Sequence, residues 1–527
     1  RDWSSDVCSS DLMFFVSMFF VSMFFVFMFF VSFVMFTKIV CIVLYIHWYF
    51  IHMQSSMLFP VYFQQLEVPE KDKHMYGEVA TPYQVIEDMF RLLPSEMFEN
   101  PDLKWFDPCC GNGFFMEILY NRLFRGLQEC FPKEEERKEH IMHNMLYMMD
   151  IQEKFRERLK RKGFIHVWIG DMFQFHHSRD IIFDVVLANP PYNVNGKMKV
   201  PTMKYANKTQ DGKAIWMDCI RYIMTYCLKE SGISLFITPV LWLRPDRYHC
   251  HSSFFSEYSV DKLCVFNCTE SQDLFEGYAQ TPVCFFTLRH YTIGMNRHIL
   301  HLYDRIHDEY ALWNTFAYGF VIPMNVPTII MKIMKKVKSY SDTYTSMMLS
   351  PIVHKTNMPV KGVQLSSIKG SCEDKQMEFS YANVKTCHLK HGSIMELVIE
   401  YSNTPCVFYG IPKIIMAHKM YGIPYLDLCG TYGISNRDNY VICLKDMMRR
   451  GGLDADDVDA GDVDAGDVDT GDVDVGDGDA DAMILNAYIL GAWLETKLVR
   501  CLMGSTRYRM RYLEKWAFSF IPNILKL

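Results

Sequence analysis

Apolar and polar positions alternate in a way that divides the middle of the chain into short strands and amphipathic helices. Helical spacing of apolar residues occurs in Tyr83–Phe98, Met116–Leu127 and Ala214–Leu228. Seven apolar runs of strand length occur around them, at 105–107, 145–149, 165–169, 181–186, 234–239, 262–267 and 283–288. Strands that alternate with helices are typical of a mostly parallel sheet covered on both faces. We therefore predict an α/β domain built on a seven-stranded, Rossmann-like sheet.

Polar residues follow four of these runs, where each strand ends. They are Asp107, Asp150, Asp171 and Asn189. The carboxyl ends of parallel strands meet at one edge of a sheet, which is where α/β proteins place their ligands. We expect these four side chains to lie close together.

The fourth strand runs directly into Asn189-Pro190-Pro191-Tyr192. Two prolines fix φ and remove two backbone donors, so the turn should be rigid and rich in acceptors. With an amide on one side and an aromatic ring on the other, such a rim suits a planar amine.

The first strand leads into Asp107-Pro108-Cys109-Cys110-Gly111-Asn112-Gly113 and then into a helix. A strand, a turn with two glycines and a helix form the layout in which backbone comes close to a nucleotide-like ligand. Thr81-Pro82, at the head of the helical pattern before this turn, is expected to supply an N-cap and a first-turn proline.

These motifs together resemble those of the adenine-specific (N6) DNA methyltransferases, in particular the type II restriction-modification methylases. The Asn-Pro-Pro-Tyr string and the Asp-Pro-x-Cys-Gly-x-Gly-x-Phe string carry the resemblance, and Cys109 stands where that family usually has a small residue. The resemblance implies a methyltransferase sheet, S-adenosyl-L-methionine as cofactor, double-stranded DNA as substrate, and methyl transfer to the N6 amine of a flipped-out adenine.

The resemblance also assigns roles to individual residues. Asn189, Pro190, Pro191 and Tyr192 would be catalytic, with two oxygen acceptors holding the amine and the tyrosine stacking on the base. The cofactor would be bound by Thr81, Pro82, Asp107, Pro108, Gly111, Gly113, Asp150, Asp171 and Met172. Asp150 would take the ribose hydroxyls, and Asp171 with Met172 the adenine ring. No metal would be required.

Two other classes of protein remain open from the sequence. Methyltransferases acting on a glutamine amide of a protein or on guanine in ribosomal RNA share the Asn-Pro-Pro-Tyr motif, because each target is a planar amine. A catalytically silent DNA-binding module is the alternative from outside the enzymes. No carboxylate and lysine cluster typical of a fused nuclease was found.

The first 52 residues are expected to lie outside the fold. Arg1–Leu12 resembles translated adapter sequence, and Met13–Phe36 repeats Met-Phe-Phe-Val-Ser within an apolar stretch that continues to about Ile51. That stretch is long enough to cross a bilayer. The strict five-residue repeat instead favours translated low-complexity DNA ahead of a start near Met53 or Met57.

The acidic balance of the chain comes from one segment. The chain has 54 Lys+Arg and 61 Asp+Glu, a net charge of −7, and 13 of the Asp lie in residues 454–482. Removing those 13 from 61 leaves 48 acidic residues, so the remainder is mildly basic, as a nucleic-acid enzyme would be. The segment repeats Gly-Asp-Val-Asp-Ala and is predicted to be a disordered insertion.

We place the catalytic domain at residues 66–290 and a mixed α+β target-recognition region at 291–527. The second region is rich in basic, aromatic and amide residues at 413–421, 430–440 and 505–512. Five lysines between Asn193 and Lys213 are expected to contact phosphates. The 17 scattered cysteines show no zinc spacing and indicate reduced thiols and an intracellular protein, in a microbial or virus-infected cell. A monomer is expected; the recognition sequence, host and partner nuclease are not indicated.

Overall fold

The computed structural model describes most of the chain after residue 80. The residues described are 58–59, 80–178, 180–193, 214–243, 257–275, 282–291, 299–304, 307–315, 322–324, 328–343, 348–356, 362–369, 378–390, 394–418, 423–436, 438–448, 477–507, 513 and 515–526. The adapter-like and apolar N-terminal segments and the five-lysine loop lie outside these residues. No helix within them combines the length and apolar character needed to cross a bilayer.

A nine-stranded sheet forms the first half of the molecule, in the order β3-β2-β1-β4-β5-β7-β6-β8-β9. Strands β1 to β5 run parallel, β7 is antiparallel to both of its neighbours, and β8 is parallel to β6. The strands are β1 Trp105–Asp107, β2 Leu146–Asp150, β3 His166–Ile169, β4 Phe183–Ala188, β5 Leu228–Pro239, β6 Tyr258–Val265, β7 Val283–His290, β8 Ile299–Asp304 and β9 Glu309–Asn314.

All seven predicted strands form, but the sheet has two more than the sequence analysis predicts. Strand β8 pairs with the open side of β6, in the register Lys262↔His301, and β9 adds a hairpin to it. The sheet therefore runs past residue 290, the predicted end of the catalytic domain. The two additional strands cover an edge of β6 that would otherwise leave backbone groups unpaired.

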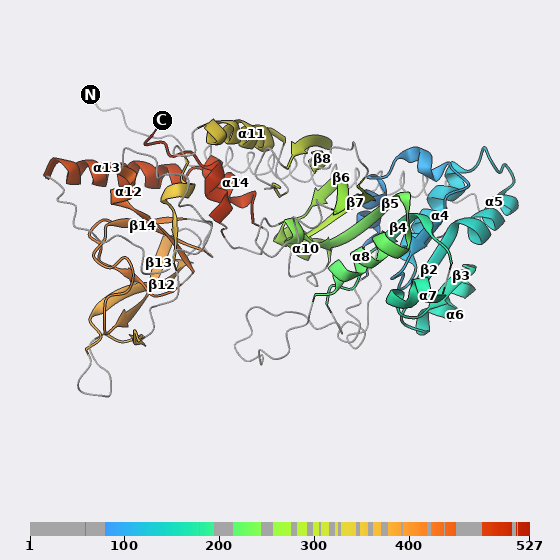
Figure 1. Ribbon diagram of the computed structural model, residues 1–527, viewed down its shortest axis with the longest axis horizontal. Coiled ribbons are helices and arrows are strands. Elements are labelled where there is room, and N and C mark those ends of the chain that lie inside the picture. Colours follow the sequence, from blue (N-terminus) through green and yellow to red (C-terminus); the bar gives the residue numbers. More distant parts are fainter. Residues whose placement is uncertain are drawn as a thin grey trace, which may run out of the picture.

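Helices cover both faces of the sheet, as alternation along the strands requires. In β2, Leu146 and Met148 face one core cluster while Tyr147 and Met149 face the other. The first cluster includes α3, α4 and α6, and the second includes α7 and α8 (Figure 1). These helices are α3 Tyr83–Phe90, α4 Phe114–Gly126, α6 Lys154–Arg161, α7 Phe175–Ser178 and α8 Trp216–Tyr226; α5 Glu134–His140, the π-helix Ile141–Met145, the 3-10 turns Met172–Gln174 and Val240–Leu243, and α10 Cys268–Leu274 complete this half.

The first helix is shorter than predicted. The pattern predicts a helix over Tyr83–Phe98, but α3 ends at Phe90 and a separate 3-10 turn covers Ser95–Phe98. Pro94 precedes that turn in an extended conformation, with ψ of 136°. A proline within a helical pattern removes a backbone donor and disfavours helix at the residue before it.

The second half is built from two four-stranded sheets and several helices (Figure 1). One sheet has the order β10-β17-β14-β15, and the other β11-β13-β12-β16. The strands are β10 His354–Lys355, β11 Leu365–Ser366, β12 Tyr381–Lys390, β13 Ile394–Ser402, β14 Lys413–Ala417, β15 Pro424–Asp427, β16 Gly433–Ile434 and β17 Asn439–Cys443. The helices are α11 Thr328–Thr343, the 3-10 turn Ser350–Ile352, α12 Leu444–Met448, α13 Asp477–Leu494, α14 Lys497–Gly504 and the 3-10 helix Lys515–Phe520.

One prediction for the C-terminal end needs correction. The predicted disordered insertion ends earlier than residue 482, since α13 begins at Asp477. The remainder of that insertion lies outside the described residues. Helix α13 ends at Leu494, and Thr496 accepts from the backbone N–H of Val499 and starts α14.

The two halves share one core. A single cluster of buried residues includes Phe286 and Trp313 from the large sheet and Leu502 and Phe518 from the C-terminal helices. In Figure 1, α11 and α14 lie between the large sheet and the C-terminal sheets. The packing that positions the sheet edge therefore continues into the C-terminal half.

Gly126, in the last turn of α4, offers a test of this packing. A Cβ at that position would lie 2.2 Å from the Phe98 carbonyl oxygen, a backbone atom that cannot move alone. Alanine gains about 1 kcal/mol of helix propensity over glycine, but overpacking costs about 1–3 kcal/mol. We expect Gly126→Ala to lower the thermal unfolding midpoint.

Gly504→Ala is the matched control, because Gly504 ends α14 and a Cβ there meets nothing within 4 Å. That variant should be neutral or slightly more stable in the same calorimetric scan. A Gly126→Ala protein as stable as Gly504→Ala would show that α4 does not pack on Phe98 as described.

Candidate active site

The four polar strand ends do meet at one edge of the sheet. Strands β3, β2, β1 and β4 are consecutive neighbours, and they end at or near Asp171, Asp150, Asp107 and Asn189. Backbone hydrogen bonds join the turns that follow them: Cys110 N–H donates to the Met149 carbonyl at 2.9 Å, and Gly170 N–H to the Asp150 carbonyl at 3.0 Å. The edge is thus one connected surface.

The two glycines of the turn after β1 are required for different reasons. Both have positive φ, +49° at Gly111 and +84° at Gly113. A Cβ on Gly113 would lie 2.5 Å from Leu159 of α6, whereas a Cβ on Gly111 would meet nothing within 4 Å. Gly113 therefore allows α4 to pack on α6, and Gly111 leaves open space beside its backbone.

Asp107 is a buried carboxylate with an unused acceptor. The residue is 1% exposed, and its Oδ1 accepts a hydrogen bond from the Cys109 N–H at 3.0 Å. Its Oδ2 has no hydrogen-bond partner among the described residues. Burial, with a smaller contribution from the Asp150 charge, raises the pKa of Asp107 to about 8. A cationic group placed at Oδ2 would offset this cost.

Asp150 supports the glycine turn. Its Oδ2 accepts from the Gly111 N–H at 2.9 Å, and its Oδ1 accepts from the Gln152 N–H at 2.8 Å. Asp150 therefore has a structural role at the glycine turn that the sequence analysis does not predict.

Asp171 and Met172 lie at the end of β3. Asp171 is exposed, and its Oδ1 caps the following 3-10 turn by accepting from the Phe173 N–H at 3.0 Å. Met172 is buried, with its sulfur 3.7 Å from the Cys109 sulfur. Met172 thus forms an apolar wall next to the glycine turn, which joins the ends of β1 and β3.

The Asn189 side chain is held by Thr81. Asn189 Nδ2 donates to the Thr81 hydroxyl at 3.0 Å, across 108 residues of sequence. The predicted N-cap role of Thr81 is wrong: Pro82 occupies the N-cap position of α3, without a side-chain cap, and the Thr81 hydroxyl is used for Asn189 instead. With Nδ2 bound to Thr81, the amide directs its oxygen, an acceptor, to the other side.

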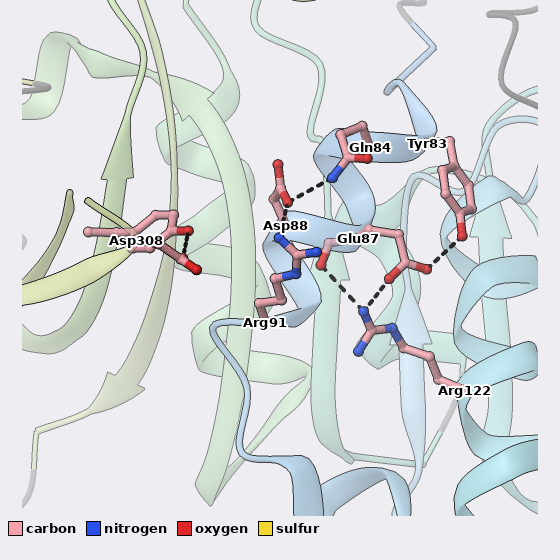
Figure 2. Close-up of polar contacts among 8 residues, drawn as sticks. Tyr83, Gln84, Glu87, Asp88, Arg91, Arg122 and Asp308 are labelled. Atoms are coloured by element: carbon pink, nitrogen blue, oxygen red, sulfur yellow. Dashed lines mark hydrogen bonds and ion pairs between the residues drawn. The ribbon is translucent and has the colours of Figure 1, made fainter. Parts of the chain in front are cut away.

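A polar network fixes α3, the helix that follows Thr81. The Arg122 guanidinium of α4 pairs with the Glu87 carboxylate of α3, and the Tyr83 hydroxyl donates to Glu87 at 3.1 Å (Figure 2). Arg122 also lies over the rings of Phe90 and Phe98, with its Cζ 5.4 and 5.3 Å from their centroids. Because the glycine turn leads into α4, this network fixes Thr81 relative to that turn.

The sequence analysis misses this network and two further basic residues. Arg158 donates to the Asn112 side chain at 2.6 Å and Lys162 to the Asn112 carbonyl at 3.2 Å, so α6 holds the tip of the glycine turn. Helical spacing gives Glu87, Arg122 and Arg158 a surface position on their own helices. Only the packing of one helix against another identifies their partners.

The Pro-Pro-Tyr turn packs against the core of the sheet. Pro190 is buried, Pro191 and Tyr192 are partly buried, and Tyr192 packs against the core cluster on the α8 face of the sheet. Burial raises the pKa of Tyr192. The Tyr192 carbonyl accepts from the Ile215 N–H at 3.1 Å, which brings together the two described ends of the lysine-rich loop.

Several residues of the predicted DNA-contact segments are structural. Lys413, Asn439, Tyr440, Ser505 and Thr506 are all at most 2% exposed, so they cannot contact DNA as placed. Lys413 and Asp427 form a buried ion pair at 2.6 Å. Thr431 is exposed, and His418, Tyr432 and Asn436 are partly exposed, while Lys419–Tyr421, Arg437 and Tyr508–Tyr512 lie outside the described residues.

Comparison with known proteins supports a methylase at this edge. Residues 108–274 match the model of the Eco57I restriction-modification methylase family. That range begins at the glycine turn and includes Asn189 to Tyr192. A protein from Mycoplasma pneumoniae named "uncharacterized adenine-specific methylase" is 40% identical over 88 residues, which are 16% of this chain and 21% of the relative. The chain thus matches about a fifth of the relative's length.

Solved structures of low similarity also align. The M protein of the type I restriction enzyme EcoKI matches with a TM-score of 0.32 and 12% identity, over 42% of this chain and 47% of that one. A class I S-adenosylmethionine-dependent methyltransferase from Listeria monocytogenes, described as putative, matches with a TM-score of 0.30 and 12% identity, over 44% and 64%. TM-scores this low add nothing to the assignment, which rests on the family match. Residues 108–274 of this chain are therefore similar to the methylase of the Eco57I restriction-modification family.

Proposed function

We propose that the protein is a site-specific DNA methyltransferase that moves a methyl group from S-adenosyl-L-methionine to the N6 amine of adenine. The observation that carries the proposal is the Asn189 amide, held by Thr81 at 3.0 Å at the same sheet edge as the glycine turn and the buried Asp107 carboxylate. This reaction requires an oriented hydrogen-bond acceptor for the amine and a carboxylate that binds the cationic cofactor.

The residues at the edge suit S-adenosyl-L-methionine. The unused Oδ2 of Asp107 can accept from the ligand's ammonium group, and the space beside Gly111 allows its backbone to approach the ligand closely. Asp150 would accept from the ribose hydroxyls, while Asp171 would give the adenine ring an acceptor and Met172 an apolar wall. Thr81, Pro82 and Pro108 complete the site. When bound, this cofactor supplies an electrophilic methyl group on a sulfonium.

The amine of adenine is a weak nucleophile because its lone pair is delocalised into the ring. Asn189 Oδ1 and the Pro190 carbonyl would each accept a hydrogen bond from one of the two N–H groups of the amine. These two hydrogen bonds favour a tetrahedral nitrogen whose lone pair is free to attack the methyl group. Catalysis then depends on positioning and on fixed dipoles. The Thr81 hydroxyl contributes by keeping the amide oxygen, and not the amide NH₂, toward the base.

An adenine within a duplex cannot reach a sheet edge, so the base must flip out of the helix at a cost of a few kcal/mol. Tyr192 is partly buried, and its ring would stack on the base and offset part of that cost.

The main alternatives are methylation of a protein glutamine or of guanine in ribosomal RNA. The adenine-specific name of the Mycoplasma relative and the two C-terminal sheets favour DNA. The C-terminal half would then select the recognition sequence. Such an enzyme would act inside the cell, in agreement with the free thiols among the described cysteines.

Asn189→Ala tests the proposal directly. We expect loss of radiolabelled methyl transfer to adenine in double-stranded DNA by at least about a hundredfold, since one acceptor of the amine is removed. Cofactor binding, measured by calorimetry, should change little. Asn144→Ala, which removes an exposed asparagine far along the sequence from the motif, should keep full activity. Methylation by the wild type of a release-factor glutamine or of ribosomal RNA, with none of DNA, would contradict the proposal.

Thr81 should act by positioning Asn189. Thr81→Val keeps the shape and removes the hydroxyl, so the amide is free to rotate; we expect the rate constant for methyl transfer to fall about tenfold or more. Thr81→Ser restores the acceptor and should recover most of the rate. Equal rates for the valine and serine variants would show that the hydrogen bond does not matter for the reaction.

Asp107→Asn should affect cofactor binding and the thermal stability of the folded protein in opposite directions. With a pKa of about 8 in the folded protein and 3.8 as the ordinary value, the folded state binds the extra proton. The wild-type stability should therefore fall as pH rises from about 4 to 8. Asparagine carries no such charge. At pH 8 without cofactor, Asp107→Asn should unfold at an equal or higher temperature than the wild type.

The same variant should lose measurable cofactor binding, because the ligand's ammonium would face an amide instead of a carboxylate. The readouts are thermal unfolding at two pH values and calorimetric titration. A variant that is less stable than the wild type at pH 8, or one that binds the cofactor normally, would contradict this role for Asp107.

A further inference from the structure

His354, Cys443 and Asp446 form a group of potential metal ligands in the C-terminal half. One ligand atom from each residue lies within 4.8 Å of the other two. They come from three elements: His354 from β10, Cys443 from the end of β17, and Asp446 from α12. None of them belongs to the methylase match at residues 108–274.

Strand register explains why these residues meet. Strands β10 and β17 are antiparallel, with His354 opposite Val441. Side chains two residues apart on a strand share a face, so Cys443 is the diagonal neighbour of His354 on the same face. Asp446 follows three residues after Cys443, in the first turn of α12, and one helical turn returns its side chain to that side.

The three side chains differ in their exposure to solvent. Cys443 is 1% exposed, whereas Asp446 and His354 have side chains 12% and 30% exposed. His354 Nε2 and Asp446 lie 2.8 Å apart, and the His354 ring is also near Phe408, with centroids 6.0 Å apart. The protein thus supplies three ligands from the inside and leaves the outer side to water.

A neighbouring lysine does not compete for the cysteine. Lys413 lies opposite Cys443 in the register of β14 and β17. Its ammonium group donates instead to Asp427 at 2.6 Å and to the Ile411 carbonyl at 3.0 Å. Cys443 and Asp446 can then provide the negative charge that a divalent cation needs.

We propose that His354, Cys443 and Asp446 bind a zinc ion, with water as the fourth ligand. A thiolate, an imidazole and a carboxylate together suit Zn²⁺ better than Mg²⁺ or Ca²⁺, which prefer oxygen ligands. With bonds of about 2.0–2.3 Å, a tetrahedral zinc ion separates its ligand atoms by roughly 3–4 Å. Binding would draw the three ligand atoms, which lie within 4.8 Å of one another, to those separations by side-chain rotation. Binding requires the cysteine to lose its proton to solvent.

The ion would join β10, β17 and α12. Strand β10 is only two residues long, and α12 only five. Helix α12 contributes Leu444 and Met447 to the core cluster that also includes Leu490 of α13. Zinc would therefore fix the sheet β10-β17-β14-β15 to its helical layer, a structural role that is independent of methyl transfer.

The test uses the full chain, freed of metal and dialysed against micromolar Zn²⁺. We expect one equivalent of zinc by plasma mass spectrometry. Substitution with Co²⁺ should give the intense visible bands of a tetrahedral site together with near-ultraviolet thiolate charge transfer. His354→Gln and Asp446→Asn should each weaken binding at least tenfold, and Cys443→Ser should abolish the charge-transfer band.

His307→Gln is the matched control, since Asp304, His307 and Glu309 form the second group of potential ligands among the described residues. Asp304 is buried, His307 and Glu309 are exposed, and the group contains no thiol. This variant should bind zinc as the wild type does. The proposal is overturned if the wild type retains no zinc, or if His307→Gln loses it while His354→Gln keeps it. Asp446→Asn and His354→Gln keep the buried cysteine in place, so their result does not depend on tolerance of a core change.

Discussion

The proposed active site depends on a constraint of electrostatics: a carboxylate, Asp107, is buried at the end of β1 with one oxygen unpaired among the described residues. Ionising a buried carboxyl group without a partner is costly, and a protein accepts that cost where a ligand supplies the partner. The glycine turn, the Asp150 hydrogen bonds and the clamp of α6 on Asn112 all serve to hold backbone around this carboxylate. The amide that would bind the substrate lies on the neighbouring strand.

Much of this arrangement follows from the sequence. Strand runs with polar ends predict the order and the common edge, because parallel strands leave no other place for those ends. The motif residues Gly111, Gly113, Asp150 and Asn189 all lie where the strand pattern puts them. The two glycines have positive φ, as turns of this kind require.

Other features depend on contacts between segments distant in sequence. Thr81 has the sequence signature of a helix cap, yet its hydroxyl binds Asn189, 108 residues away. Lys413 and Tyr440 look like groove-contacting residues, but their strands are central in a small sheet, and this placement buries them. The sequence analysis does not predict that β8 and β9 join the large sheet. Strand β8 pairs with the backbone groups at the edge of β6, and β9 pairs with β8; this long-range pairing has no local pattern in the sequence.

The continuation of the sheet through β8 and β9 makes the polypeptide hard to divide. Cutting after residue 290 would remove Trp313, which is fully buried, and would strip the neighbour from the outer side of β6. Residues 108–274 and the C-terminal half therefore share strand pairing and core packing, and are not joined by a linker alone. In evolution, exchange of one C-terminal half for another would have to preserve the strand pairing at β6 and the core packing that both halves share, so changes in loops at the surface are more readily tolerated than replacement of the whole half.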